Sequence, residues 1–175
     1  MKAWRWATIA LGSLVSACSG PKVADYAKEV PPLDIREYFN GNVHAQGLVL
    51  DRSGRVTRRF TVEMNCRWEG ERGTLQEHFL YNDGERQERT WVLVHQPDGS
   101  FRGTAGDVVG EANAAQAGSA FRMNYTLAVV VKGKTWNLDF DDWMFRIDDR
   151  AVMNRAVFGK FGIRLGEVVV AFQHG

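Results

Sequence analysis

The sequence has little of what most catalytic and metal sites require. Two cysteines and four histidines occur in 175 residues, and no HExxH, CxxC or other metal-ligand spacing connects them. A GxSxG elbow, a Walker loop and a GxGxxG fingerprint are all absent. We therefore predict no metal site, no cofactor and no catalytic residue, and we expect a protein that is not an enzyme.

The sequence also has no excess of charge of either sign and no long apolar run. The chain has 22 basic and 21 acidic residues, and this balance suggests neither a nucleic-acid partner nor an anionic membrane as a partner. The longest apolar run, at 7–15, is too short to cross a bilayer as a helix. Beyond residue 40 no helical stripe lasts three turns, which argues against a helix bundle.

The N-terminus has the features of a lipoprotein leader. Lys2 and Arg5 precede the apolar stretch 7–15, and the following letters VSAC end at Cys18. A branched apolar residue three positions before a cysteine, with small residues between, resembles the lipobox that the lipoprotein signal peptidase recognises. We predict a signal peptide over 1–17 and lipid attachment at Cys18; the alternative is an ordinary secretory signal.

Acylation of Cys18 would anchor the protein without a membrane-spanning segment. The three acyl chains usual on such a cysteine hold a protein durably, whereas one chain holds it marginally. Ser19 stands where an inner-membrane retention signal would place Asp, so the resemblance implies the periplasmic face of the outer membrane in a Gram-negative host. Cys66 is then the only remaining thiol, and no intramolecular disulfide is expected.

Residues 18–33 contain three of the four prolines and are predicted to form a flexible, lipidated tether. A short helix should follow, because Asp34 can cap it and Ile35, Tyr38 and Phe39 fall on one side. From there to the C-terminus, residues 34–175 are predicted to form a single domain.

The dominant sequence period after residue 40 is two, which indicates β-strands. Apolar and polar side chains alternate over 59–69 and again over 120–131. Turn signals separate ten predicted strands, at 43–51, 55–69, 73–82, 87–96, 100–108, 119–132, 134–141, 143–149, 151–158 and 166–173. Eight to ten antiparallel strands in successive hairpins favour an all-β, up-and-down barrel, since closure removes exposed edges. The alternation changes phase at Asp141 and Asp142, where we expect a bulge or corner.

Four ordered motifs resemble a known family: DIREYFNG, DRSGRVTRRFTVEMNCRWEG, GTAGDVVGEA and FDDWMFRIDDRAVMNRAVFGKFGIRLGEV. They are similar to the bacterial lipoprotein family known as domain of unknown function 3833, over nearly all of the chain after Asp34. The resemblance implies a lipocalin-like fold and a lipoprotein address. It carries no established activity and no catalytic residues.

A lipocalin-like barrel of this size can hold one small ligand in a calyx, the space between its inward side chains. We predict that Glu77 and Arg89, on adjacent strands, meet inside the barrel and orient the polar head of a ligand; a purely structural ion pair is the alternative. The candidate calyx residues are Phe60, Met64, Trp68, Glu77, Arg89, Trp91, Met123 and Tyr125. The opposing interpretation is that these side chains fill a closed core.

Two further segments have alternative interpretations. Asp139 and Asp141 share one side of a strand, but their spacing matches no calcium loop, so solvated acids are preferred. The segment 150–166 is rich in cations, and Asn154 and Arg155 either close the barrel mouth, contact phosphate head groups or form a solvated rim.

We therefore expect a membrane-anchored periplasmic lipoprotein that binds a lipid or another apolar small molecule in a barrel calyx. In one alternative, the barrel is filled and serves as an envelope scaffold for an unknown protein partner. In the other, the calyx modifies a fatty acyl chain with Glu77, Asp107 or Asp141 as general base.

Overall fold

A computed structural model describes residues 20–174. The predicted signal peptide and Cys18 lie outside the described residues. Ten antiparallel strands follow two short helices, η1 (Val23–Tyr26) and α1 (Ile35–Tyr38). The strands are β1 (Gly41–Asp51), β2 (Val56–Glu69), β3 (Arg72–Tyr81), β4 (Arg86–His95), β5 (Phe101–Thr104), β6 (Ala112–Ala117), β7 (Ala120–Val131), β8 (Lys134–Arg146), β9 (Ala151–Lys160) and β10 (Ile163–His174). None of the helices in this part of the chain has the length and hydrophobicity needed to cross a membrane.

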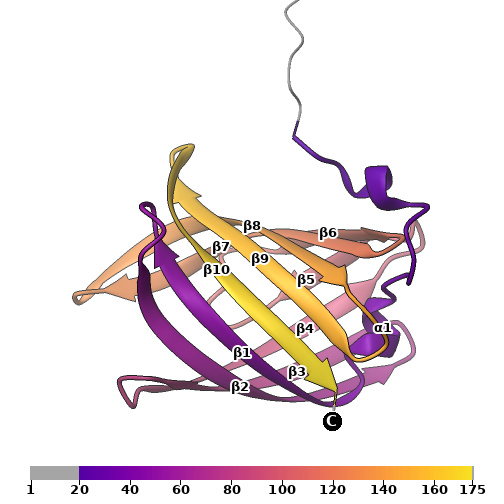
Figure 1. Ribbon diagram of the computed structural model, residues 1–175, viewed down its shortest axis with the longest axis horizontal. Coiled ribbons are helices and arrows are strands. Elements are labelled where there is room, and N and C mark those ends of the chain that lie inside the picture. Colours follow the sequence, from indigo (N-terminus) through magenta and orange to yellow (C-terminus); the bar gives the residue numbers. More distant parts are fainter. Residues whose placement is uncertain (1–19, 175) are drawn as a thin grey trace, which may run out of the picture.

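The strands form a closed barrel in which each one pairs with its neighbours in sequence (Figure 1). Closure is made by β1 and β10, which pair from Val43 opposite His174 to Asp51 opposite Gly166. The predicted all-β up-and-down barrel is therefore confirmed. Hairpins β1–β2, β3–β4, β7–β8 and β9–β10 surround one end, which we call the mouth, and α1 lies at the other (Figure 1).

Two of the predicted strand boundaries are wrong. The predicted strands 134–141 and 143–149 are one strand, β8, whose register with β7 runs unbroken from Val131 opposite Lys134 to Ala120 opposite Phe145. The predicted strand 100–108 ends early, as β5, and the sequence ANAAQA forms the unpredicted β6. This segment lacks the β-branched and aromatic residues that mark strands, so its pairing depends on its neighbours.

The predicted bulge at Asp141 and Asp142 is also absent from the pairing with β7. The apolar phase changes because Trp143 and Phe145 face outward, where they are covered by Tyr26 of η1. The ring centroid of Tyr26 lies 5.7 Å from that of Trp143 and 5.1 Å from that of Phe145, both in edge-to-face arrangements. An outer sheet face covered by another segment needs apolar residues on both sides, as a buried sheet does.

The contacts of Tyr26 also correct the prediction of a flexible tether, because residues 20–33 pack on the barrel. The backbone N–H of Leu33 donates to the carbonyl of Gly118 at 2.8 Å. The Ser119 hydroxyl donates to Glu29 at 2.7 Å, and Arg146 donates to the carbonyl of Pro32 at 3.0 Å. The packed unit therefore begins well before Asp34.

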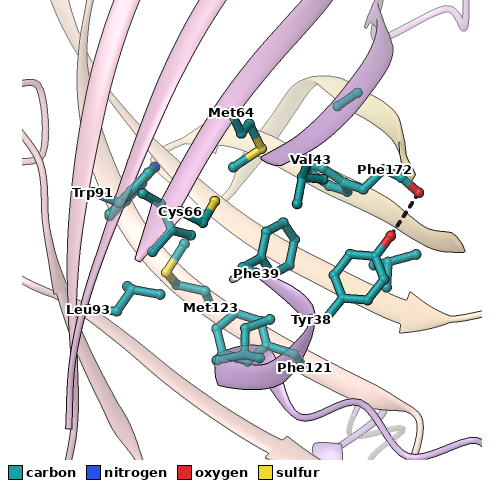
Figure 2. Close-up of a cluster of buried hydrophobic side chains, with 14 of the residues drawn as sticks. Tyr38, Phe39, Val43, Met64, Cys66, Trp91, Leu93, Phe121, Met123 and Phe172 are labelled. Carbon is teal, nitrogen blue, oxygen red and sulfur yellow. Dashed lines mark hydrogen bonds between the residues drawn. The ribbon is translucent and has the colours of Figure 1, made fainter. Parts of the chain in front are cut away.

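Helix α1 fills the barrel end opposite the mouth. Asp34 caps it by accepting a hydrogen bond of 2.8 Å from the backbone N–H of Arg36, as the sequence predicts. Figure 2 shows Phe39 pointing into the middle of the inward-facing side chains, among them Cys66, Phe121 and Met123. Phe39 is 1% exposed, and burial of such a ring contributes about 2–3 kcal/mol. This end of the interior, which we call the helix half, is a packed core.

Candidate functional site

We call the part of the interior toward the mouth the mouth half. Its side chains are less completely buried than those around α1. Its inward-facing side chains alternate with outward ones along every strand and are largely aromatic or branched. They keep part of their surface accessible, in contrast to the fully buried residues around Phe39. This set comprises Val49, Phe79, Tyr81, Gln87, Arg89, Tyr125, Phe140, Phe158 and Val168.

Aromatic contacts shape this half of the interior. The rings of Tyr125 and Phe140 stack with centroids 5.1 Å apart, and Phe140 lies 5.4 Å from Phe158. On the opposite wall, Phe79 and Tyr81 stack at 6.0 Å. Partly accessible aromatic rings that face inward provide the type of surface that small-molecule sites use.

A charged cluster lies at the base of the mouth half. Glu77 on β3 is the register partner of Arg89 on β4, and the guanidinium Nη1 lies 3.6 Å from Glu77 Oε2. The predicted meeting of Glu77 and Arg89 inside the barrel is therefore observed. The stronger contact of Arg89, however, is with Asp107, to which it donates three hydrogen bonds of 2.8 to 3.1 Å.

Asp107 reaches this cluster because the loop between β5 and β6 folds along β7. The backbone N–H of Ala128 donates to the carbonyl of Asp107 at 2.8 Å, and that of Val109 donates to the carbonyl of Thr126 at 2.9 Å. The sequence analysis considered Asp107 only as a general base and missed its pairing with Arg89, since the pairing depends on a contact between distant segments.

A second polar group adjoins the first. The Tyr125 hydroxyl donates to Asp142 Oδ2 at 2.9 Å, and Asn154 donates to the other oxygen of Asp142. Both Asp142 and Asn154 are buried and face inward. The sequence could have placed Asp142 inside, because it continues the alternation of Leu138 and Phe140. The assumed change of phase hid this signal.

Burial perturbs the charges in both groups. It raises the pKa of Glu77 to about 7, since the opposing effect of Arg89 is weaker and Asp107 and Asp142 add to the shift. It also raises the pKa of Asp142 to about 6, against the hydrogen bonds from Tyr125 and Asn154. Burial disfavours the charge on Arg89, but Glu77 and Asp107 outweigh it and raise the pKa of the guanidinium.

One acceptor in this cluster is unused. Within residues 20–174, Glu77 Oε2 is buried and has no hydrogen-bond partner. A buried polar atom without a partner costs about 1–3 kcal/mol, so such atoms are few and call for an explanation. A ligand that donates a hydrogen bond to Glu77 would supply the missing partner.

The structure divides the eight predicted calyx residues between the two halves. Met64, Trp68 and Met123 belong to the packed cluster around α1, and the Trp68 indole donates to the Phe39 carbonyl at 2.9 Å. These three are core residues, because α1 occupies the space that they were predicted to line. Phe60 and Trp91 are also buried members of this cluster, which leaves Glu77, Arg89 and Tyr125 as the predicted calyx residues that lie in the mouth half.

The outer surface bears two hollows. One, of about 610 Å³, crosses β1, β2 and their neighbours and includes Leu48, Leu80 and Met153. The other, of about 480 Å³, lies over β6–β9 and includes Asn124 and Asp139. The linings of both hollows combine outward side chains with inward-facing residues, which are Phe60 and Tyr81 in the first hollow and Tyr125, Phe140 and Phe158 in the second.

Other predicted candidates are engaged elsewhere. Asp141 faces outward and pairs with Arg122, with the closest atoms 2.6 Å apart, while Asp139 accepts a hydrogen bond of 2.8 Å from Thr126. Arg155 pairs with Glu167 at 2.7 Å on the outer face. Burial raises the pKa of Cys66 to about 12, so its thiol stays protonated. Within the described chain, no three potential metal ligands come together.

Comparison with known proteins identifies the family. The family described as "Protein of unknown function (DUF3833)" matches residues 12–174. The chain belongs to this family. No curated protein matches this DUF3833 member in sequence.

Solved structures resemble the DUF3833 barrel in fold. The S-type phycobiliprotein lyase CPES from Guillardia theta superposes with a TM-score of 0.59 at 7% identity, covering 89% of this chain and 98% of the lyase. EF1p2_mFAP2b bound to DFHBI is less similar, with a TM-score of 0.43, 6% identity and coverage of 79% and 95%. At 7% identity the likeness to the lyase concerns the fold alone, and it confirms the predicted lipocalin-like barrel.

Proposed function

We propose that the protein binds an apolar small molecule, a lipid or a similar compound, in the mouth half of its barrel. The observation that carries the proposal is the combination of partly accessible inward aromatics with the unpartnered, buried Glu77 Oε2. The packed helix half closes the far end, so the ligand would enter from the mouth. A wholly filled envelope scaffold is less well supported, since it would leave Glu77 Oε2 without a hydrogen-bond partner.

The polar group of the ligand follows from the charges around Glu77. Arg89 already donates to Asp107, which leaves an acceptor and no free cation at the base of the site. A carboxylate ligand would meet a net negative cluster, whereas a hydroxyl or an amine could donate to Glu77. We therefore propose an apolar ligand that carries a hydroxyl or an amine, and not a free fatty acid.

Two fluorescent probes of equal chain length test this preference, a dansyl-labelled long-chain amine and a dansyl-labelled long-chain carboxylic acid. The amine should bind more tightly, and its affinity should rise as the pH passes about 7, where Glu77 ionises. In Glu77→Gln the preference and its pH dependence should disappear, while the outer-face control Glu88→Gln should retain both. Equal affinities for the two probes in the unmodified protein would reject this head-group assignment.

If neither probe binds, the binding function can still be tested with the natural ligand. Native mass spectrometry of the protein purified from its host should reveal a non-covalent adduct that a Phe158→Trp substitution, which narrows the mouth half, removes. An adduct-free protein that also binds neither probe would contradict the binding function.

We also propose the lipoprotein address, with acyl chains on Cys18 at the periplasmic face of the outer membrane and no catalysed reaction. The sequence features of residues 1–19 support it. Metabolic labelling with an alkyne palmitate should tag the protein, and Cys18→Ala should abolish the tag. Labelling that persists in the variant would contradict the assignment.

One observation supports the alternative function, modification of a fatty acyl chain. Of its three candidate bases, Asp141 is paired outside the barrel and Asp107 is held by Arg89. Glu77 alone combines an interior position with a pKa near 7, the range that suits a general base. Recovery of the natural ligand in two chemical forms from the unmodified protein, and in one form from Glu77→Gln, would favour this second function.

A further inference from the structure

Two of the four mouth hairpins expose large apolar side chains at their tips. On β9–β10, Phe161 is 88% exposed and Ile163 is 62% exposed. On β7–β8, Val130 is 69% exposed, and Trp136 on the same hairpin is 43% exposed. Contiguous exposed apolar groups of this kind mark interaction sites. Figure 1 shows both hairpins projecting beyond the barrel, away from α1.

The same two hairpins are cationic. Lys132 and Lys134 flank the tip of β7–β8, while Lys160 and Arg164 flank the tip of β9–β10. The segments 128–138 and 158–166 contain no acidic residue. Arg164 pairs with Glu167 at 3.1 Å, whereas among the described residues no carboxylate pairs with Lys132, Lys134 or Lys160. Although the net charge of the chain is close to zero, this part of its surface is locally positive.

The turn at Phe161 departs from the usual sequence preference. Phe161 adopts a φ of +53°, and Gly162 follows it at +76°. Hairpin turns of this kind favour Asn, Asp or Gly at the first position, because a bulky side chain is strained there. An aromatic residue held at such a position and pointing into solvent breaks a local rule without a folding benefit, which is typical of functional positions.

Lys160 connects the two tips. Its ammonium nitrogen lies 4.8 Å from the ring centroid of Trp136 on β8 and 5.2 Å from that of Phe161. Lys160 thus joins the two tips through Trp136 and Phe161, and both hairpins carry exposed apolar groups together with cations. We call the residues Val130, Val131, Lys132, Lys134, Trp136, Lys160, Phe161, Ile163 and Arg164 the tip patch.

The turns of the β1–β2 and β3–β4 hairpins are polar, in contrast to the two apolar tips. In β1–β2, Asp51 accepts hydrogen bonds from Ser53 and Arg55. In β3–β4, Asp83 lies 2.8 Å from Arg58. These tips are polar and satisfied internally, so they provide a built-in control.

We propose that the tip patch docks on the surface of an anionic phospholipid bilayer. Aromatic and branched side chains would enter the boundary between head groups and acyl chains, while the lysines would contact lipid phosphates. Such docking would turn the mouth half toward the bilayer. The proposal is independent of acylation at Cys18 and of any ligand in the barrel, because it concerns only exposed residues of two hairpins.

Vesicle sedimentation tests the docking with a chain that begins at residue 20, which has no acyl group and retains every described element of the barrel. Phosphatidylcholine vesicles that contain one quarter phosphatidylglycerol should bind the protein, and phosphatidylcholine alone should bind it more weakly. Added salt should weaken the binding. Trp136 fluorescence should shift to shorter wavelength on binding, and the shift should vanish in Trp136→Phe.

The decisive variant is Phe161→Asn, because Asn is favoured at a positive φ and leaves the turn intact. Vesicle partitioning should fall roughly tenfold. In Lys132→Gln and Lys134→Gln it should fall roughly fivefold for each charge removed. The matched controls Arg52→Gln and Val56→Asn, on the β1–β2 hairpin, should leave partitioning unchanged.

Three outcomes would overturn the proposal. The first is no binding of the unmodified protein to anionic vesicles, and the second is equal partitioning of Phe161→Asn. The third is a dimer, seen in sedimentation velocity, that Phe161→Asn abolishes without an effect on vesicles, since it would assign the tip patch to a second copy of the chain.

Discussion

The two halves of the barrel share the eight longer strands, yet they enclose different environments. In the helix half Phe39 is 1% exposed and the surrounding side chains are apolar. In the mouth half, inward aromatic rings stay partly accessible, and four charged groups lie below them. Since the eight longer strands continue through both halves, the difference comes from the segments at the ends, chiefly α1, which fills one end only. A closed barrel therefore specifies a wall, and the segments at its ends determine whether the interior is a core or a compartment.

The largest expected effect is a difference in the loss of stability between a substitution in the helix half and one in the mouth half. Phe39→Ala should lower the free energy of unfolding by about 3–5 kcal/mol, because the cavity forms in a packed core. Phe79→Ala, in the mouth half, should cost about 1 kcal/mol, since its ring is already partly accessible. Urea unfolding measures both changes. Equal losses would show that the mouth half is packed as densely as the helix half.

The next largest loss of stability is expected for a substitution in the charged cluster. Arg89→Met should destabilise the protein by about 3 kcal/mol at pH 8, because it leaves Glu77 and the partly buried Asp107 without their cation. The loss should shrink at pH 5, where Glu77 is protonated. On the outer face, Arg67→Met removes an exposed pair with Glu69 and should change stability by less than about 0.5 kcal/mol. A similar change in both variants would mean that the cluster is solvated like the surface.

Glu77 sets a pH dependence of opposite sign to that of most carboxylates. Its folded-state pKa, about 7, exceeds the ordinary value of 4.5, so the folded state holds the proton more tightly. Stability should therefore be highest below pH 4.5 as far as this group is concerned, and fall as the pH rises toward 7. Glu77→Gln should be stabilising by about 2–3 kcal/mol at pH 8 and neutral at low pH.

Thermal unfolding of both proteins across this pH range measures the difference. Asp142, with a pKa of about 6, is present in both proteins. The stability of the variant should therefore still fall with rising pH, but less steeply. A Glu77→Gln variant that is less stable than the unmodified protein at pH 8 would contradict the assignment of a strained, unpartnered carboxylate.

The smallest loss of stability is expected on the outer face of the barrel, where Tyr26 packs on β8. Tyr26→Ala should cost about 1 kcal/mol, because it removes two edge-to-face contacts with Trp143 and Phe145. Amide exchange should accelerate at the N–H of Leu33, which bonds to Gly118. The control Val30→Ala, at an 83% exposed position of the same segment, should change neither quantity. No effect of Tyr26→Ala would restore the tether interpretation of residues 20–33.

The sequence was sufficient to predict the wall of the barrel. Strict alternation placed Phe60, Met64 and Met123 on the inner face and made Glu77 and Arg89 neighbours, because period two and hairpin order leave few alternatives. The cap at Asp34 and the apolar side of α1 were equally local signals. Alternation says which side chains face inward, however, and it does not say what occupies the interior.

The remaining features depend on contacts between distant segments. Insertion of Phe39 into the barrel, docking of Tyr26 on β8 and the reach of Asp107 to Arg89 each join residues that no local pattern relates. The misplaced phase at Asp141 shows the consequence. Without the contact of Tyr26, the apolar Trp143 and Phe145 indicated a change of phase and a bulge, whereas β8 continues without one and Asp142 is buried inside.

The difference between the two halves can be tested directly by titrating the protein, labelled with nitrogen-15 and with carbon-13 in its phenylalanine rings, with dodecylamine and following the NMR signals. We predict that the ring signals of Phe79, Phe140 and Phe158 shift together with the Glu77 amide, while those of Phe39 and Phe101 stay in place. Shifts confined to the outer hollow around Leu48, Leu80 and Met153, or none at all, would contradict a ligand compartment inside the barrel.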